Sequence, residues 1–355
     1  MTAEATVLLI GVGATGEQLA AQLAARGTVG QIVLASRSPV DDAALTIRLT
    51  TGCRVDAVQL DATRLDDVAE LLARLRPDLV VQAASLRSPS ALRGRTDPVA
   101  VALTKAGFAI RLPHQLPVAL TVMRAARAAG YEGPVANLSF PDVVGPILAA
   151  QGLAPTVGLG NAAMILLRVR DALRESPPLP LVRVLAHHTL LQGSMQAVRP
   201  AEGAPRARVY LGEDGERADE LAYAGPGQPP GPRHGAVTAA SSLPVLEALL
   251  PGAAPLRWST PAPRGLPGGY PVTVSRHAVE LDLPPGLDHD DAVRFNEEAA
   301  RGDGVDRIDA DGTVHFTEYC REALAAVAPD LAEPLQIAAL DERAARLDEV
   351  LDDRR

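Results

Sequence analysis

Aromatic residues, cysteine and lysine are all scarce in this sequence of 355 residues. Phe, Tyr and Trp together make up only 3%, so a core must be built from Leu, Val and Ala. The two cysteines, Cys53 and Cys320, are too few for a disulfide framework or a Cys-rich zinc site. Because Lys105 is the only lysine, any catalytic lysine would have to be this one.

The sequence also lacks a long apolar run and an excess of positive charge. Its first apolar segment is too short to span a bilayer, and no basic segment precedes it. The net charge is -9 at pH 7, and an acidic surface repels nucleic-acid phosphates and anionic lipids. We therefore expect a cytoplasmic protein that acts on a small molecule, with neither nucleic acid nor a membrane as its partner.

Short apolar strands alternate with helical patterns in the first part of the chain. The pattern predicts strands at 6–10, 31–35, 54–60, 78–85 and 133–140, and helices at 15–26, 64–76 and 114–129. These strands are apolar throughout rather than alternating, which is typical of a parallel sheet covered on both faces. The sequence therefore predicts an α/β fold with a Rossmann-type doubly wound parallel sheet.

The second part of the chain has a different pattern, broken by proline-rich segments. Candidate strands lie at 181–187, 207–211, 272–283 and 313–317, and candidate helices at 160–175, 236–250, 288–300 and 317–328. We expect a Rossmann domain over 1–160, a mixed α+β catalytic domain over 161–330 and a C-terminal helix within 331–355. That amphipathic helix has two possible docking sites, the body of the chain or a second subunit of a homodimer.

The glycines Gly11, Gly13 and Gly16 form a G-x-G-x-x-G motif between a strand and a helix. In this context Gly11 allows the tight turn, Gly13 lets the backbone approach a pyrophosphate, and Gly16 lets the helix pack closely. The helix start, with Thr15, would then hold the phosphates. The alternative is a tight turn without a ligand, and the surrounding strand–helix–strand pattern favours dinucleotide binding.

The second strand ends in Ser36, Arg37 and Ser38, where NAD-binding sequences carry an acidic residue. An arginine there pairs with the 2′-phosphate of NADP, so we expect NADP rather than NAD. Asp61, after the third strand, is either an adenine neighbour or the N-cap of the next helix. The remaining expected cofactor contacts, at the end of the fourth strand, are Ala83 and Ala84.

From Val7 to about Ser90 the sequence resembles the nucleotide-binding domain of saccharopine dehydrogenase-like proteins. The matching segments are "LLIGVGATGEQLAAQLAARG", "IVLASRSP" and "VQLDATRLDDVAELLARLRPDLVVQAAS". The rest of the chain does not match that family's catalytic domain, so its catalytic residues cannot be transferred. The resemblance implies a dinucleotide-binding domain and favours amine or imine chemistry.

A second, weaker resemblance links Val135 to Asn161, "VANLSFPDVVGPILAAQGLAPTVGLGN", to lactate and malate dehydrogenases. In that family an Asn beside the nicotinamide follows the fifth strand, which implies this role for Asn137. The family's next helix carries an Asp and an Arg. In "NAAMILLRVRD" the Asp position is apolar, which leaves Arg168 as the remaining cation. This resemblance implies a two-domain dehydrogenase that acts on a ketone or hydroxy acid.

Two adjacent histidines, His187 and His188, end a predicted strand of the second domain. Histidine there can exchange a proton with a carbonyl oxygen or an imine nitrogen as hydride is transferred. Their side chains point to opposite faces of a strand, so only one need be catalytic, and both remain candidates beside a buried structural role. Adjacent histidines lack the spacing to bind one metal ion, and we expect no metal.

Residues 85–113 form an unusually long connection that carries several cations: Arg87, Arg93, Arg95, Lys105 and Arg111. It is interpreted either as a cationic lid over a carboxylated substrate or as a solvated loop. The sequence thus predicts an NADP-dependent oxidoreductase that exchanges hydride with a C=N or C=O carbon of a small carboxylated metabolite. The alternative is a dinucleotide-binding protein without redox turnover, acting as a sensor or structural subunit.

Overall fold

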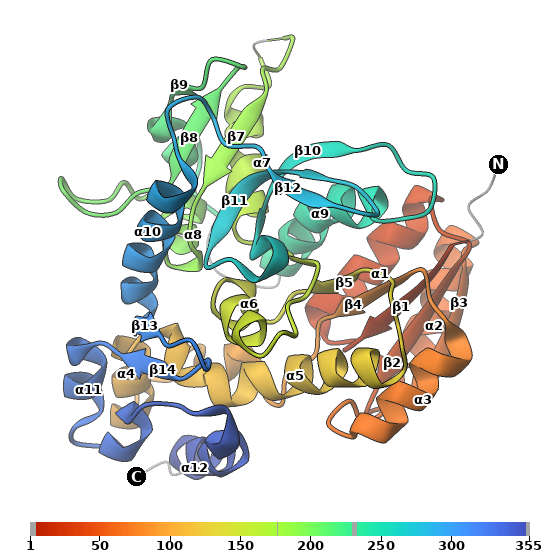
Figure 1. The fold of residues 1–355 in the computed structure, drawn as a ribbon, viewed down its shortest axis with the longest axis horizontal. Helices are drawn as coiled ribbons and strands as arrows, with labels where there is room; N and C mark the ends of the chain where they lie inside the picture. The colour runs from red at the N-terminus through yellow and green to blue at the C-terminus, as the bar shows by residue number, and fades with distance from the viewer. Residues whose placement is uncertain (1–4, 176, 229–232, 353–355) are drawn as a thin grey trace.

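The structure is a computed structural model that describes residues 5–175, 177–228 and 233–352 (Figure 1). Its largest sheet is parallel, with strand order β3-β2-β1-β4-β5-β6. The strands are β1 (Thr6–Ile10), β2 (Gln31–Ser36), β3 (Arg54–Gln59), β4 (Leu79–Gln82), β5 (Val135–Asn137) and β6 (Val157–Gly158). This is the order of a doubly wound Rossmann sheet, so the predicted fold class is confirmed.

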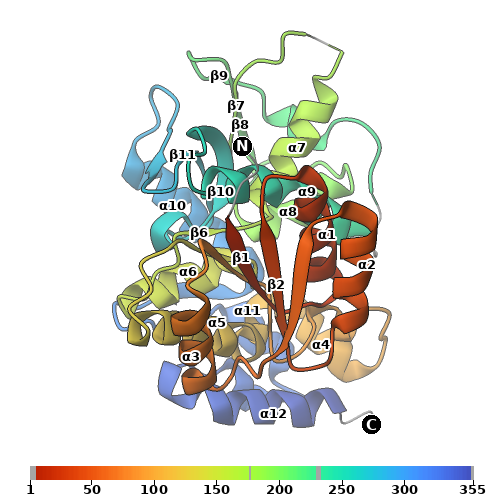
Figure 2. The ribbon, with the colours of Figure 1, turned by 90° about the vertical axis from the view of Figure 1, so that its right-hand side faces the viewer.

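Helices cover both faces of this sheet, as Figure 2 shows for α1 and α2 on one side and α3 on the other. The helices of this part are α1 (Ala14–Arg26), α2 (Asp41–Thr51), α3 (Leu65–Leu75), α4 (Pro98–Lys105), α5 (Leu112–Ala128) and α6 (Pro141–Ala150). Val7 and Leu9 of β1 belong to the apolar core shared with α1 and α2. Leu8 and Ile10 belong to the core shared with α3 and α5, which explains why the strand is apolar throughout.

The second part of the chain is built around two antiparallel three-stranded sheets, with strand orders β7-β8-β9 and β10-β11-β12. Their strands are β7 (Val182–Leu185), β8 (Arg208–Leu211), β9 (Glu216–Arg217), β10 (Leu256–Pro261), β11 (Gly269–Val274) and β12 (Val279–Leu281). The helices of this part are α7 (Ala162–Ala172), α8 (His188–Met195), α9 (Arg233–Ala248) and α10 (His289–Ala300). α9 packs against α1, which fixes the second part beside the glycine motif.

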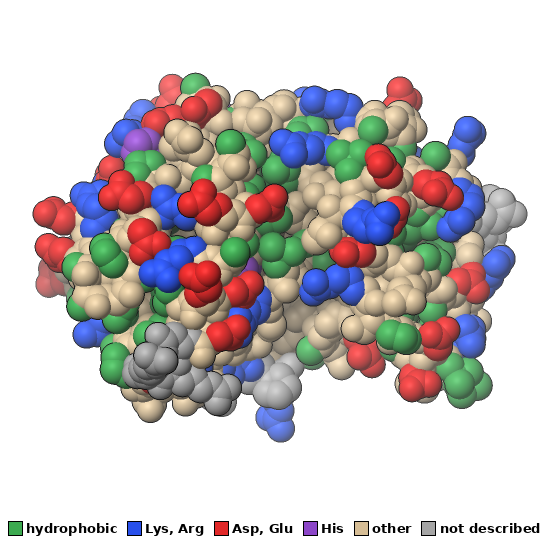
Figure 3. All heavy atoms as spheres, turned by 90° about the horizontal axis from the view of Figure 1, so that it is seen from below, with side chains coloured by type: hydrophobic (Ala, Val, Ile, Leu, Met, Phe, Trp, Pro, Cys, Tyr) green, Lys and Arg blue, Asp and Glu red, His purple; other side chains and the backbone are tan. Residues whose placement is uncertain are grey.

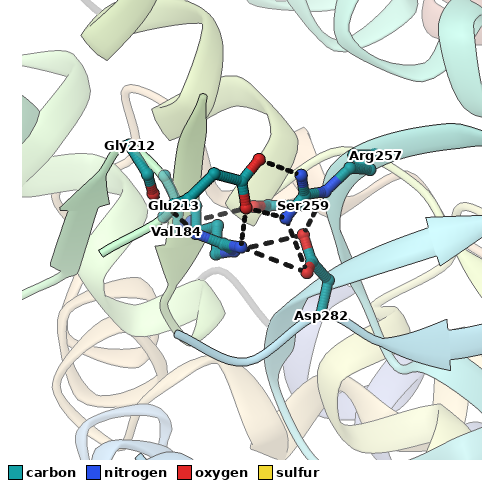
Figure 4. Close-up of polar contacts among 7 residues, drawn as sticks. Val184, Gly212, Glu213, Arg257, Ser259 and Asp282 are labelled. Carbon is teal, nitrogen blue, oxygen red and sulfur yellow. Dashed lines mark hydrogen bonds and ion pairs between the residues drawn. The ribbon is translucent and has the colours of Figure 1, made fainter. Parts of the chain in front are cut away.

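A network of ion pairs links these two sheets, and we call Arg183, Glu213, Arg257 and Asp282 the sheet-bridging ion network (Figure 4). The Arg183 side chain is only 4% exposed, and its Nε lies 3.1 Å from Asp282 Oδ2. Arg257 Nε lies 2.9 Å from the same oxygen. Burial and the two arginines act in opposite directions on Asp282, and the arginines prevail, so its pKa lies below the ordinary value.

The C-terminal part packs under α4 and α5 rather than forming a separate body (Figure 1). It contains β13 (Val305–Ile308), β14 (Val314–Phe316), α11 (Glu318–Leu324) and α12 (Leu340–Asp352). Leu347, Val350 and Leu351 of α12 are buried in the same apolar cluster as α4 and α5. The amphipathic C-terminal helix therefore docks on the body of its own chain.

The connection over 85–113 contains one α-helix and two short 3-10 helices rather than an extended loop. The 3-10 helices are η1 (Pro89–Leu92) and η2 (Phe108–Arg111), on either side of α4. Arg87 holds this segment to α12, with ion pairs of 2.7 Å to Asp348 and 2.7 Å to Asp352. In Figure 3 acidic and basic side chains are interspersed over the face seen from below. None of the described helices is both long enough and apolar enough to cross a membrane.

Candidate active site

A cleft of about 1060 Å³ lies at the carboxyl ends of the parallel strands, facing α8 and α9. In an open α/β sheet this edge is where ligands bind. Every strand from β1 to β5 contributes the residues that follow it, and the lining includes 11–16, 36–40, 60–63, 83–86 and 138–141. α8 and the 3-10 helix η5 (Arg301–Asp303) supply the facing wall with His188, Gly302 and Asp303.

The glycine loop is shaped by close backbone contacts at two of its three glycines. Gly11 has a φ of +101°, and a Cβ there would lie 2.6 Å from the Ala84 Cα. A Cβ on Gly16 would overlap the carbonyl oxygen of Gly11. Ala83 and Ala84 line the cleft directly opposite this turn. Only glycine fits at positions 11 and 16, because any side chain would push the loop away from β4 or from α1.

Gly13 has a different environment, because a Cβ there would meet nothing within 4 Å. It is the N-cap of α1, and no described side chain caps this helix. The N–H groups of the first turn are therefore available to the cleft, where a helix N-terminus favours an anion. Thr15 also lines the cleft, with its Oγ1 beside Gly235 of α9. The loop thus has the room and the donors that a pyrophosphate requires.

Ser36, Arg37 and Ser38 also line the cleft, at the end of β2. Within the described part of the chain, the Arg37 guanidinium has one hydrogen bond, a long one of 3.4 Å to the Leu86 carbonyl. These three side chains can donate to a phosphate group placed beyond β2.

Asp61 lines the same end of the cleft, but its carboxylate is engaged locally. Its Oδ1 accepts hydrogen bonds from the Thr63 hydroxyl at 2.7 Å and the Thr63 N–H at 3.1 Å. These bonds hold the pKa of Asp61 below its ordinary value. Asp61 therefore shapes the turn before α3 while it faces the cleft, and Arg64 rather than Asp61 is the N-cap of that helix.

His188 is the first residue of α8, and it lies in the cleft with its side chain 24% exposed. Its Nδ1 lies 2.8 Å from Oδ2 of Asp303. Its backbone N–H donates to Oδ1 of the fully buried Asp142 at 2.8 Å. The ring is therefore oriented by one carboxylate and the start of the helix by another, and none of the described residues bonds the His188 Nε2.

The two side chains of the His188–Asp303 pair shift each other's titration. Burial lowers the pKa of His188, but the Asp303 carboxylate outweighs it, and the net pKa lies above the ordinary value. Burial raises the pKa of Asp303, but the neighbouring His187 and His188 lower it by more. The net pKa of Asp303 therefore lies well below the ordinary value, and the carboxyl stays ionised. Such a pair favours the protonated form of the imidazole next to the cleft.

Aromatic rings and one cation surround His188. The ring centroids of Phe108 and Phe140 lie 4.8 Å and 5.0 Å from that of His188. The Arg111 guanidinium lies 5.0 Å from the Phe108 ring centroid, and it also lines the cleft. Burial lowers the pKa of Arg111, but a guanidinium remains charged. The site thus combines a histidine held by a carboxylate, a cation and aromatic walls.

His187 and Asn137 lie outside the lining that the described residues give this cleft. His187 is buried, and its Nδ1 accepts the Thr189 N–H at 3.3 Å and lies 3.4 Å from Asp303 Oδ2. Asn137 is also buried, and both ends of its amide bond the Ser139 backbone at 3.1 Å. Both side chains hold the turns that carry cleft residues.

Arg168 likewise lies outside this lining. Its guanidinium donates to the carbonyls of Ala224 and Pro226 at 2.6 Å and 3.0 Å. The cation that faces the cleft near His188 is Arg111 instead.

The sequence prediction gives no individual role to Asp303, Asp142, Phe108 or Phe140, although Phe140 and Asp142 lie in the segment after the fifth strand that it places at the ligand-binding edge. Asp303 is 115 residues from His188 along the chain, so no spacing rule connects them. The sequence position of Asp142 could have predicted a role, since Asp142 is the second residue of α6, shortly after the end of β5 at the ligand-binding edge.

Comparison with known families and structures agrees with this geometry. The KR domain family model matches residues 5–102, which contain the glycine loop and β1 to β4. The sequence matches none of the curated proteins compared with it.

Two solved dehydrogenases share the fold. The minor L-lactate dehydrogenase of Enterococcus mundtii superposes with a TM-score of 0.51 at 14% identity, over 84% of this chain and 96% of the other. The malate dehydrogenase of Picrophilus torridus superposes with a TM-score of 0.50 at 14% identity, over 97% of this chain and 100% of the other. Both likenesses establish the fold alone.

The family match and the cleft geometry support an NAD(P)-dependent oxidoreductase with a Rossmann-type dinucleotide-binding domain. The dehydrogenase layout predicted for the middle of the chain agrees with the fold of these neighbours. The resemblance to saccharopine dehydrogenase-like proteins, the choice of NADP over NAD and the substrate stay predictions.

Proposed function

We propose that this protein is an NADP-dependent dehydrogenase that exchanges hydride with the carbonyl carbon of a small carboxylated substrate. The observation that carries the proposal is the His188–Asp303 pair, which lies in the same cleft as the glycine loop. A bound nicotinamide would supply or accept the hydride. The protein then has to exchange one proton with the substrate oxygen, and His188 is suited to that step.

In the reducing direction, protonated His188 donates from Nε2 to the carbonyl oxygen as the carbon receives hydride. In the oxidising direction the neutral ring accepts the hydroxyl proton, so atoms and charges balance in both directions. Asp303 orients the ring through Nδ1 and stabilises the imidazolium form. Asp303 stays ionised throughout, because its pKa lies well below its ordinary value.

Arg111 is the residue that we assign to the substrate carboxylate. It lies in the cleft over the Phe108 ring, and the same ring contacts His188, which supports placing the two groups at one end of the cleft. A guanidinium binds a carboxylate through paired hydrogen bonds, which would fix the carbonyl next to His188. An imine carbon is the other acceptor that His188 could serve, and the saccharopine dehydrogenase-like N-terminal segment favours it.

The test is steady-state turnover with NADPH and a panel of α-keto acids and imines, for the unmodified protein and for His188→Gln. We expect His188→Gln to lower kcat on the order of 100- to 10,000-fold, the scale of general acid catalysis, with cofactor affinity unchanged. His289→Gln is the control, since His289 is exposed on α10 and its partner is Asp290. Full activity of His188→Gln would refute the assignment. Tight cofactor binding without turnover on any substrate would favour the non-catalytic alternative.

The preference for NADP rests on Arg37, and it is tested separately. A charge-assisted bond to the 2′-phosphate is worth about 1.5–3 kcal/mol, or roughly 10- to 100-fold in affinity. Arg37→Ala should weaken NADP binding by this factor and leave NAD binding unchanged, measured by calorimetry. Equal affinities of the unmodified protein for both cofactors would leave Arg37 an ordinary surface residue.

A further inference from the structure

A second hollow, which we call the α8 groove, lies on the other side of α8 from the cleft. It measures about 620 Å³, within the range of ligand pockets. It is bordered by α8, the segment 198–205, the end of α10 and the start of α11. Most of its lining is apolar or aromatic and includes Leu190, Val198, Pro200, Pro205, Tyr223, Ala299 and Tyr319.

The α8 groove meets the cleft at the His188–Asp303 pair. Thr189 and Gly302 line both hollows, and each is the chain neighbour of one member of the pair. The Thr189 hydroxyl lies so close to Gly302 that a Cβ there would overlap it. These two small residues are in contact and form the divide between the hollows, so a substrate that reaches His188 lies next to that divide, with the groove on its other side.

The charges at the rim of the groove are mostly neutralised. Arg199 pairs with Glu220 at 3.2 Å, and Arg301 pairs with Asp306. The Tyr319 hydroxyl donates to the Arg301 carbonyl at 2.6 Å. An occupant would therefore meet apolar side chains rather than an available cation, which excludes a phosphate or a second carboxylate as the favoured ligand.

The apolar lining is partly open to water. Val198 is 56% exposed and Tyr319 is 39% exposed, and both are among the large hydrophobic residues that remain exposed in the structure. Covering such surface is favourable in proportion to its area.

We propose that the α8 groove binds an apolar chain of the substrate, so that the preferred substrate is a carboxylated carbonyl compound with an alkyl tail. This inference rests on the proposed function, since His188 has to meet the carbonyl. Arg111 would hold the carboxylate in the cleft, and the alkyl chain would cross the divide between Thr189 and Gly302 into the groove.

The experiment is calorimetric binding of straight-chain α-keto acids, from pyruvate to α-ketodecanoate, to the protein saturated with NADP⁺. Each buried methylene contributes about 0.8 kcal/mol, so the Kd should fall roughly 4-fold per carbon until the groove is filled. Val198→Glu places a charge in the groove and should make the Kd nearly independent of chain length. Val101→Glu is the matched control, because Val101 is 41% exposed on α4 and lines neither hollow.

A Kd independent of chain length would overturn the inference. So would an unchanged dependence in Val198→Glu, because the chain would then lie elsewhere. Turnover is measured in parallel and tests the proposed function by itself. Turnover of pyruvate without an effect of chain length on Kd would support hydride transfer and refute binding of the alkyl chain in the groove. A Kd that depends on chain length, without turnover, would support binding in the groove and refute hydride transfer.

Discussion

Replacing Gly11 by alanine should destabilise the fold, whereas the same change at Gly13 should weaken cofactor binding and leave the fold intact. The difference follows from what a methyl group would meet. At Gly11 the backbone has a φ of +101°, which costs other residues about 1–3 kcal/mol. The added Cβ would also lie 2.6 Å from the Ala84 Cα, and such overpacking costs about 1–3 kcal/mol more. The free energy of unfolding should fall by about 2–6 kcal/mol.

Gly13 has an ordinary extended backbone, with φ -81° and ψ -176°, and an added Cβ has nothing within 4 Å. Alanine is a poorer N-cap than glycine, but it also has less entropy to lose from the unfolded chain. We expect these effects to leave the stability within about 1 kcal/mol. The methyl group would instead occupy the approach to the first turn of α1. Loss of a charge-assisted bond there costs about 1.5–3 kcal/mol, or roughly 10- to 100-fold in affinity.

Two measurements on each variant separate these effects. Urea unfolding followed by circular dichroism gives the stability, and calorimetry with NADP⁺ gives the affinity. Gly13→Ala with undiminished affinity would show that no pyrophosphate approaches this loop. Gly11→Ala with undiminished stability would show that the loop does not contact the end of β4 as described.

Three further changes test the rest of the structure. Asp303→Asn should move the alkaline limit of carbonyl reduction to lower pH. The reason is that Asp303 raises the pKa of His188 and reduction needs the protonated ring. The measurement is the pH–rate profile of both proteins. An alkaline limit that stays at the same pH would show that His188 does not transfer the proton. Arg183→Met removes the buried arginine of the sheet-bridging ion network but leaves Asp282 paired with Arg257, so it should cost about 1.5–3 kcal/mol of unfolding free energy in urea. Arg87→Ala removes two partly exposed pairs to α12 and should cost less, about 0–2 kcal/mol, by the same measurement.

The elements that the sequence predicts well are those with a strong local signal. The glycine loop, the first strands and α1 follow from an apolar run, a motif and a helical period within some thirty residues. α4 also had a local signal that our reading omitted, since Asp97 caps the helix and Pro98 occupies its first turn. Interpreting 85–113 as an extended loop overlooked this signal, whereas a cationic lid over the substrate stays a prediction.

Other elements depend on tertiary contacts that no local pattern contains. α6 has Pro146 in its interior and Gly145 beside it, both of which disfavour a helix. Its packing explains the exception, because a Cβ on Gly145 would overlap the Ala262 side chain across the interface with η4 (Pro263–Gly265). β6 has only two residues, too few for a period to appear.

The candidate site likewise has one part that the sequence predicts and one part that it does not, and the difference follows from how the site is built. Cofactor contacts cluster in one loop and at neighbouring strand ends, so a motif can reveal them. The proposed chemistry depends on His188, whose helix start is held by Asp142 from the Rossmann part and whose ring is held by Asp303 from the C-terminal part. Because three separate segments must fold before this geometry exists, the ring is oriented only in the complete fold. The proposed site therefore leaves a clear sequence signature for its cofactor loop, whereas the sequence offers His188 only as one of two candidate histidines and gives no signal for its partner Asp303.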